Sequence, residues 1–90
     1  MDSTADDGPA QTLQRKILTY MLEHPEAKDT AGGIMNWWLG GTAGIPEAEV
    51  SAALDDLLQR GWVIATRYGQ TVIYGFAKAE TAVVRKFLGR

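Results

Sequence analysis

The stretch from Pro46 to Gly61 constrains this chain most, because PEAEVSAALDDLLQRG is the clearest helix in the sequence. Its apolar residues recur at three- and four-residue intervals, the spacing of one buried helical face. The proline suits the start of a helix, the glycine suits a left-handed C-terminal residue, and two glutamates in the first turn favour the positive end of the dipole. We therefore predict a helix on which the other elements pack. Its apolar set is Val50, Ala53, Leu54, Leu57 and Leu58.

Both ends of this helix carry apolar signals. With the proline as N-cap, Ile45 and Val50 occupy the two positions of a hydrophobic staple. With Gly61 left-handed at the other end, Trp62 can fold back onto Leu57. These contacts would fix the direction in which the chain enters and leaves the helix.

Two helices are predicted before it. Pro9–Glu23 has an apolar face and ends before His24-Pro25, because a residue preceding proline leaves helical geometry. A weaker helix begins at Asp29 or Thr30 and runs to about residue 39, although two glycines in its first turns cost roughly 1 kcal/mol each relative to alanine. Residues 40–44 form a flexible, glycine-rich turn. On the first helix, the side chains expected to face water are Gln14, Arg15, Thr19 and Glu23.

After Gly61 the period becomes strand-like, and two segments predict a β-hairpin, 62–67 and 71–76. A three-residue loop, Tyr68-Gly69-Gln70, gathers most apolar side chains on one face, whereas a two-residue loop would split them between faces. We therefore expect the longer loop. The expected pairs are Thr66 with Val72, Ile64 with Tyr74 and Trp62 with Phe76, which leaves Val63 and Ile73 on the other face.

The last segment, Lys78–Leu88, returns to a helical pattern. It has more apolar residues than a short terminal helix needs if it only covers the hairpin. Intramolecular packing and a homodimer surface are the two interpretations of this excess. The apolar residues concerned are Val83, Val84, Phe87 and Leu88, beside the basic residues Arg85, Lys86 and Arg90.

Length and composition limit the architecture to one small domain. Ninety residues allow a single core, and the absence of cysteine excludes a disulfide framework and a thiolate metal site. Residues 1–8 are small, polar and acidic and are expected to be a disordered tail, which leaves 9–90 as the domain. The net charge is −2, or about +1 without the tail's aspartates, so no strongly basic footprint is present. No secretory signal or membrane span is recognisable, and we expect a cytoplasmic protein.

The order of these elements, and the run Leu54-Asp55-Asp56-Leu57-Leu58-Gln59-Arg60-Gly61-Trp62-Val63, resemble the winged helix-turn-helix superfamily of bacterial regulator-like proteins. The resemblance covers about residues 10–88. It implies an α+β fold with a three-helix core, a β-hairpin wing and a C-terminal helix. A short extra strand between the second and third helices, frequent in that superfamily, is also compatible.

The resemblance implies a DNA-binding module of the transcription-regulator kind, in which the strong helix enters the major groove. Its outer face, Ala48, Ala52, Asp55, Asp56 and Gln59, is acidic, whereas base and phosphate contacts rely on Arg, Lys, Asn and Gln. The alternative is a winged helix that contacts protein and not DNA. A positive stripe joining Arg60, Arg67 and Lys78 would favour DNA. The candidate contact residues are Ser51, Ala52, Asp55, Gln59, Arg60, Arg67, Tyr68 and Gln70.

Other signals are weaker. Neighbouring helical side chains diverge by about 100°, so Trp37 and Trp38 do not face the same core; Met35 and Trp37 form a candidate protein-interaction patch, with rim packing as the alternative. The single histidine, His24, lacks metal-ligand neighbours, and Ser51 lacks a catalytic base. We therefore expect no enzyme activity, cofactor or metal, and no small-molecule substrate is identifiable.

Overall fold

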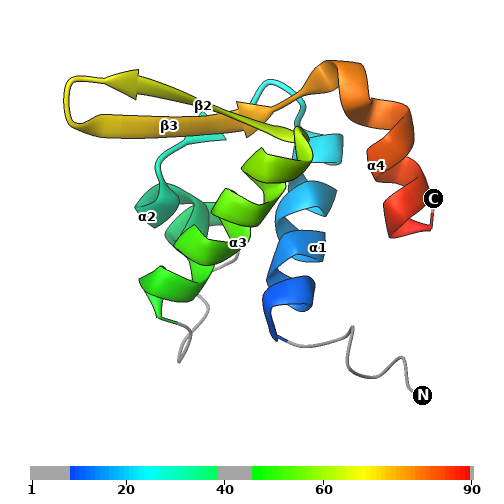
Figure 1. The fold of residues 1–90 in the computed structure, drawn as a ribbon, viewed down its shortest axis with the longest axis horizontal. Helices are drawn as coiled ribbons and strands as arrows, with labels where there is room; N and C mark the ends of the chain where they lie inside the picture. Colours follow the sequence, from blue (N-terminus) through cyan, green and yellow to red (C-terminus); the bar gives the residue numbers. More distant parts are fainter. Residues whose placement is uncertain (1–8, 39–45, 90) are drawn as a thin grey trace.

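The computed structural model describes residues 9–38 and 46–89, which form helices packed beneath one face of a small sheet (Figure 1). The fold is α+β. The elements in chain order are α1 (Pro9–Glu23), β1 (Lys28–Asp29), α2 (Ala31–Gly33), the π-helix η2 (Ile34–Trp38), α3 (Glu47–Arg60), β2 (Val63–Tyr68), β3 (Thr71–Phe76), the 3-10 helix η3 (Lys78–Glu80) and α4 (Thr81–Leu88).

Helix α1 has the predicted bounds, and its apolar face is buried, with Ile17 and Met21 fully inaccessible. The prediction that Gln14 faces water is wrong. Gln14 is only 4% exposed, and its Nε2 donates to Oδ2 of Asp56 on α3 at 2.7 Å. The periodicity of α1 alone could not reveal this, because the polar partner that makes burial tolerable comes from another helix.

Strand β1 and helix α2 join through a tight turn. Thr30, one of the two predicted candidates, is the N-cap, and its Oγ1 accepts from the amide of Gly33 at 3.1 Å. Oδ1 of Asp29 accepts from the Thr30 amide at 2.8 Å, and its carboxylate occupies the space that a Cβ on Gly33 would need. Only a residue without a Cβ leaves room for the Asp29 carboxylate here, so Gly33 permits this packing despite its low helix propensity. The predicted continuous α-helix is one α-turn followed by η2.

Strand β1 does not lie between the second and third helices, where a short extra strand was compatible with the sequence. It lies between α1 and α2 and pairs antiparallel with β3, Lys28 opposite Gly75 and Asp29 opposite Tyr74. Any strand between the second and third helices would fall on 39–45, outside the described residues. Two residues are too few for a periodic signal, so β1 could not be found from the sequence.

Helix α3 confirms the predicted ends. Pro46 is the N-cap and Gly61 is left-handed, with φ 81°. The amides of Gly61 and Trp62 donate to the carbonyls of Leu58 and Leu57 at 3.0 and 3.1 Å, which is the Schellman arrangement. The staple partner Ile45 lies outside the described residues.

The predicted hairpin is present, but its predicted register is wrong. The strands are joined by the two-residue turn Gly69-Gln70, and Tyr68 pairs with Thr71. Gly69 has φ 63° and no described non-glycine residue has positive φ, the pattern of a type II′ turn. The sheet order is β1-β3-β2. The observed pairs are Val63–Phe76, Ile64–Gly75, Ala65–Tyr74, Thr66–Ile73 and Arg67–Val72.

The register follows from the end of α3. Trp62 is held by the Schellman turn, so it precedes the strand and does not take part in its alternation. Val63 is then the first inward residue, at 3% exposure, and Ile64 points outward at 54%. Paired residues share a face, so Phe76 and Tyr74 lie with Val63 over the helices, while Ile73 lies with Ile64 on the outer side.

Helix α4 closes the side of the core. Val84 is fully buried, and the rings of Phe87 and Trp62 lie 5.0 Å apart between centroids. No described helix has the length and apolarity needed to cross a membrane. The buried apolar cluster comprises Leu13, Ile17, Leu18, Met21, Ile34, Val50, Ala53, Leu54, Leu57, Trp62, Val63, Phe76 and Val84.

Candidate functional site

The outer face of α3 was the first candidate site. Ala52, Asp55 and Gln59 are exposed, as is Ala48, and Ser51 is half-buried. Glu47 and Glu49 occupy the first turn and are also exposed. The exposed face is therefore short side chains and carboxylates, with an amide near its end.

Asp56 does not belong to that outer face. Its Oδ2 accepts from Gln14 and lies 3.6 Å from Nε of Arg60, so it faces α1. The Arg60 guanidinium lies over the Trp62 ring at 5.0 Å and over the Phe87 ring at 5.5 Å. Arg15 lies over the same Phe87 ring at 4.8 Å. Arg60 is thus committed to the junction of α1, α3 and α4.

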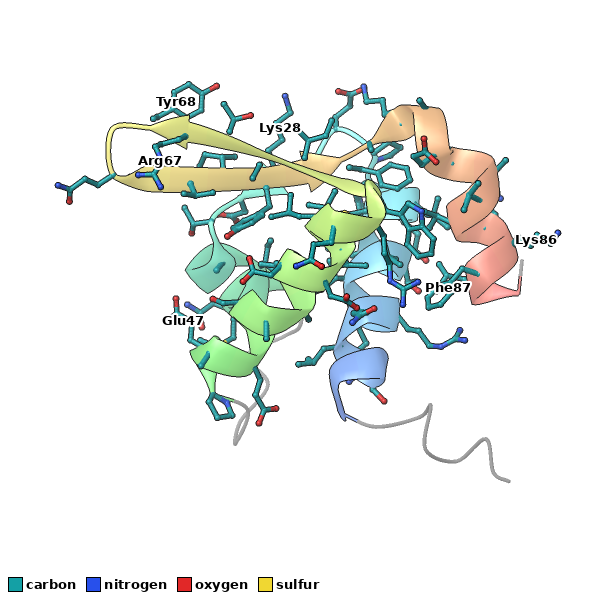
Figure 2. The ribbon with its side chains drawn as sticks, viewed as in Figure 1. Lys28, Glu47, Arg67, Tyr68, Lys86 and Phe87 are labelled. Carbon is teal, nitrogen blue, oxygen red and sulfur yellow. The ribbon has the colours of Figure 1, made fainter. Side chains whose placement is uncertain are left out.

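The three cations whose alignment in one stripe would favour DNA, Arg60, Arg67 and Lys78, lie in different places. Arg67 shares the inner side of the hairpin with Val72, and Tyr68 lies on the opposite side (Figure 2). Lys78 forms an ion pair with Glu26 beside the outer face of the sheet. With Arg60 held at the helical junction, the described residues do not form the continuous positive surface that DNA would favour.

Asp55 is exposed on α3 and acts electrostatically on Tyr74 of the hairpin. Burial, and secondarily the charge of Asp55, raises the pKa of the Tyr74 phenol above its ordinary value. Tyr74 pairs with Ala65 across the sheet, and both share the inner side with Arg67. Within the described residues, neither Asp55 nor Arg67 forms an ion pair.

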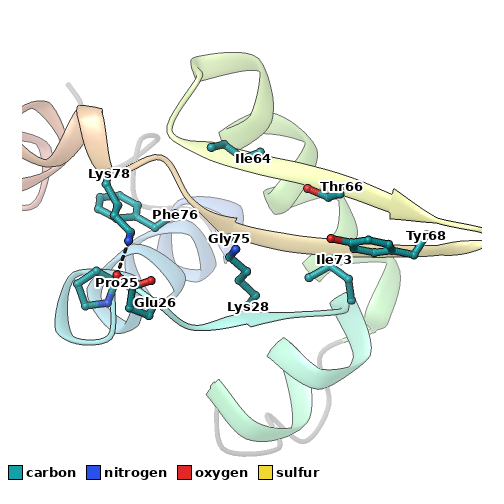
Figure 3. A pocket seen from close by; sticks show the side chains of 10 residues that line it. All are labelled: Pro25, Glu26, Lys28, Ile64, Thr66, Tyr68, Ile73, Gly75, Phe76 and Lys78. Atoms are coloured by element: carbon teal, nitrogen blue, oxygen red, sulfur yellow. Dashed lines mark hydrogen bonds and ion pairs between the residues drawn. The ribbon is translucent and has the colours of Figure 1, made fainter.

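The outer face of the sheet contains a hollow of about 340 Å³ (Figure 3). Ile64, Ile73 and Tyr68 supply its apolar wall. Ile64 is nevertheless 54% exposed and Tyr68 66% exposed. Lys28 lies across Gly75, where an added Cβ would be 3.2 Å from the lysine Cγ. The other lining residues are Pro25, Glu26, Thr66, Phe76 and Lys78.

The charges at one end of the hollow are partly neutralised. A hydrogen bond and the charge of Lys78, with a weaker contribution from Lys28, lower the pKa of the Glu26 carboxyl below its ordinary value despite slight desolvation. Two lysines and one glutamate therefore give this end a small positive excess. The hollow therefore combines apolar walls with a cation, Lys28, that forms no ion pair with any described residue.

The remaining candidates lie elsewhere. Met35 is half-buried and packs against the core, while the Trp37 side chain lies outside the described residues. Within 9–38 and 46–89, no cluster of three or more His, Cys, Asp or Glu side chains could hold a metal ion. In the last helix, Phe87 and Leu88 pack on the core, and Val83 alone of the four proposed dimer residues has a large exposure, 48%.

Sequence reasoning did not identify the outer sheet face as a site. The available signal was that Ile64 and Ile73 share a face in the two-residue-loop register that the structure has. The expectation of a single apolar face excluded that register, because it divides the apolar side chains between the two faces. The hairpin-tip residues Arg67, Tyr68 and Gln70 are exposed as expected, but they do not gather with Arg60. No protein-family model matches the chain, and no match was found among curated proteins.

Proposed function

We propose that this chain is a winged-helix domain that acts by binding another protein, and that the outer face of the sheet is its contact surface. The order α1, β1, α2, α3, β2, β3, α4 supports the winged-helix proposal. The observation that carries the contact surface is the outward placement of Ile64, Ile73 and Tyr68 around one hollow. Grouped apolar residues at a surface, with an aromatic among them, are typical of protein-binding sites.

The chemistry of the surface also favours protein over DNA. Burying an apolar wall away from water is favourable, whereas the charged phosphates that dominate a nucleic-acid surface do not provide that burial. The acidic first turn and Asp55 make α3 unfavourable for phosphate. The domain in this proposal has no catalytic role.

Site-specific photo-crosslinking tests the proposal in cells. A photoreactive amino acid at Thr66, exposed on the outer face, is expected to give a protein adduct. The same group at Ala52, exposed on α3, is the matched control and is expected to give none. A nucleic-acid adduct from position 52, or no protein adduct from position 66, would overturn the protein-contact proposal.

DNA binding is the second candidate, and one arrangement favours it. Helix α3 lies next to the hairpin (Figure 1), and its outer face offers Ser51, Ala52 and the exposed amide of Gln59. An amide chemical-shift titration with mixed-sequence duplex DNA at low salt tests it, because the phosphate contribution is strongest there. Shifts along α3 and at the hairpin tip would support DNA binding, and their absence would exclude direct contact.

A further inference from the structure

Strand β2 is an edge strand with an open side. Among the residues that the structure describes, the sheet order β1-β3-β2 gives it one neighbour, β3, and the five residues after Val63 are all exposed. The Trp62 carbonyl accepts from the Ala77 amide at 3.0 Å. Because backbone groups alternate in direction along a strand, residues 64, 66 and 68 bond to β3 while Ala65 and Arg67 direct their amides and carbonyls to the open side.

The edge has few of the features that prevent pairing with another chain. Arg67 is its one charged residue, it contains no proline, and its register with β3 continues without a bulge to the turn. An exposed edge of this kind is a template for another strand.

We propose that the partner is a second copy of this chain, paired antiparallel along β2 about a two-fold axis at Thr66; this rests on the proposed protein-binding function. The pairing places Ala65 opposite Arg67 of the second copy and forms about four main-chain hydrogen bonds. Thr66 faces its own symmetry mate. The result is a continuous sheet running through both copies.

Charge complementarity favours a copy of the same chain. Arg67 lies on the inner side of the sheet with Tyr74, Asp55 acts electrostatically on Tyr74, and neither charged residue has an ion-pair partner among the described residues. The two-fold axis brings Arg67 of the second copy opposite Ala65, the sheet neighbour of Tyr74. Each copy then adds a cation on the side of the sheet where the charge of the other copy's Asp55 acts.

The same register completes the outer hollow. Ile64 comes opposite Tyr68 of the second copy. The phenol ring of the second copy therefore extends the apolar wall beyond the open edge of β2. Both residues are more than half exposed in the single chain, Ile64 at 54% and Tyr68 at 66%. Each hollow in the dimer is therefore lined by residues from two copies.

Single-cysteine variants test the axis directly, because the chain has no cysteine of its own. Opposite residues of a non-hydrogen-bonded antiparallel pair have Cα atoms about 4.5 Å apart, within the disulfide range. We expect Thr66→Cys to form a disulfide-linked dimer at least about tenfold faster than Val83→Cys, since pairing raises the local thiol concentration. Val83 lies on α4, exposed and away from β2.

A second pair of variants tests the main-chain bonds. Ala65→Pro removes an amide that points to the open edge and leaves the bonds to β3 intact, whereas Ala65→Val keeps the amide. Sedimentation equilibrium at high protein concentration should give a dimer dissociation constant about tenfold larger for Ala65→Pro than for Ala65→Val. Circular dichroism and thermal melting establish that both variants are folded.

The outcomes separate this inference from the proposed function. A monomer at all concentrations, or equal cross-linking of the two cysteine variants, would overturn the β2 dimer. Dimerisation that survives Ala65→Pro would also overturn it, and preferential cross-linking of Val83→Cys would place the contact on α4. A protein adduct from position 66 to a different chain would then leave the proposed protein-binding function standing with another partner.

Discussion

The two faces of the sheet have similar side chains in different surroundings. The inner face buries Val63 and Phe76, whereas the outer face leaves Ile64 more than half exposed and surrounds a hollow with it. Alternation along β2 and β3 is equally regular on both sides. The difference arises at the end of α3, where the Schellman turn sets which residue enters the strand first. The residue types alone therefore do not determine which face of a hairpin is buried.

The largest expected effect is a difference in the free energy of unfolding between alanine variants of two consecutive residues, Val63 and Ile64. Val63→Ala removes buried methyl groups and should lower the free energy of unfolding by about 2 kcal/mol. Ile64→Ala removes more atoms from a half-exposed position and should cost under about 1 kcal/mol. Urea unfolding of both variants measures the difference. If Ile64→Ala were the more destabilising, the three-residue loop register would be correct and the inner and outer faces would be exchanged.

A smaller loss of stability is expected on substitution of Gly61, whose Schellman turn sets the register of the hairpin. Gly61 has φ 81°, a conformation that costs alanine roughly 1 kcal/mol, so Gly61→Ala should destabilise the chain by about that amount. Gln59→Ala, at an exposed position on the same helix, is the control and should change stability by less than about 0.5 kcal/mol. Equal stabilities by thermal melting would contradict the role given to the Schellman turn.

The smallest effect concerns Tyr74 on the inner face. Its phenol has a raised pKa, so the folded state favours the neutral form more than the unfolded state does. The resulting stabilisation is complete below the ordinary value of 10.0 and is lost as the pH rises through the folded-state value. In a phenolate absorbance titration, Asp55→Asn should move this ionisation to lower pH without abolishing the shift, because burial is the larger cause.

The control for the Tyr74 titration is Glu49→Gln, an exposed change that removes a different carboxylate from α3. This variant should leave the ionisation of the Tyr74 phenol at its wild-type pH. If it moved the titration as much as Asp55→Asn, the effect would reflect overall charge, and Asp55 would not be close to the ring.

The helical part of the fold was predictable because its signals are local. The bounds of α1 and both ends of α3 follow from apolar spacing and from proline and glycine at helix ends, and the cap of α2 was narrowed to Asp29 or Thr30. The two hairpin segments were also predicted from β-branched and aromatic residues, within one residue at their ends.

What could not be predicted depends on contacts distant in sequence. Gln14 is buried because Asp56 accepts its hydrogen bond, 42 positions away. The outer hollow unites Pro25 and Lys28 with the hairpin only after β1 has paired with β3. The position of Arg60 at the helical junction depends on the rings of Trp62 and Phe87. No local pattern contains these relations, so the sequence predicted the elements better than the surfaces they form.

The pairing of β1 with β3 has a consequence for synthesis. Lys28 meets its neighbour Gly75 only after the intervening chain has been made, so β1 stays unpaired while α1 to α3 leave the ribosome. The helices contact one another earlier, since α1 packs directly on α3. The nascent chain can therefore assemble a helical pair first, while the apolar side that later receives the sheet is still open to water.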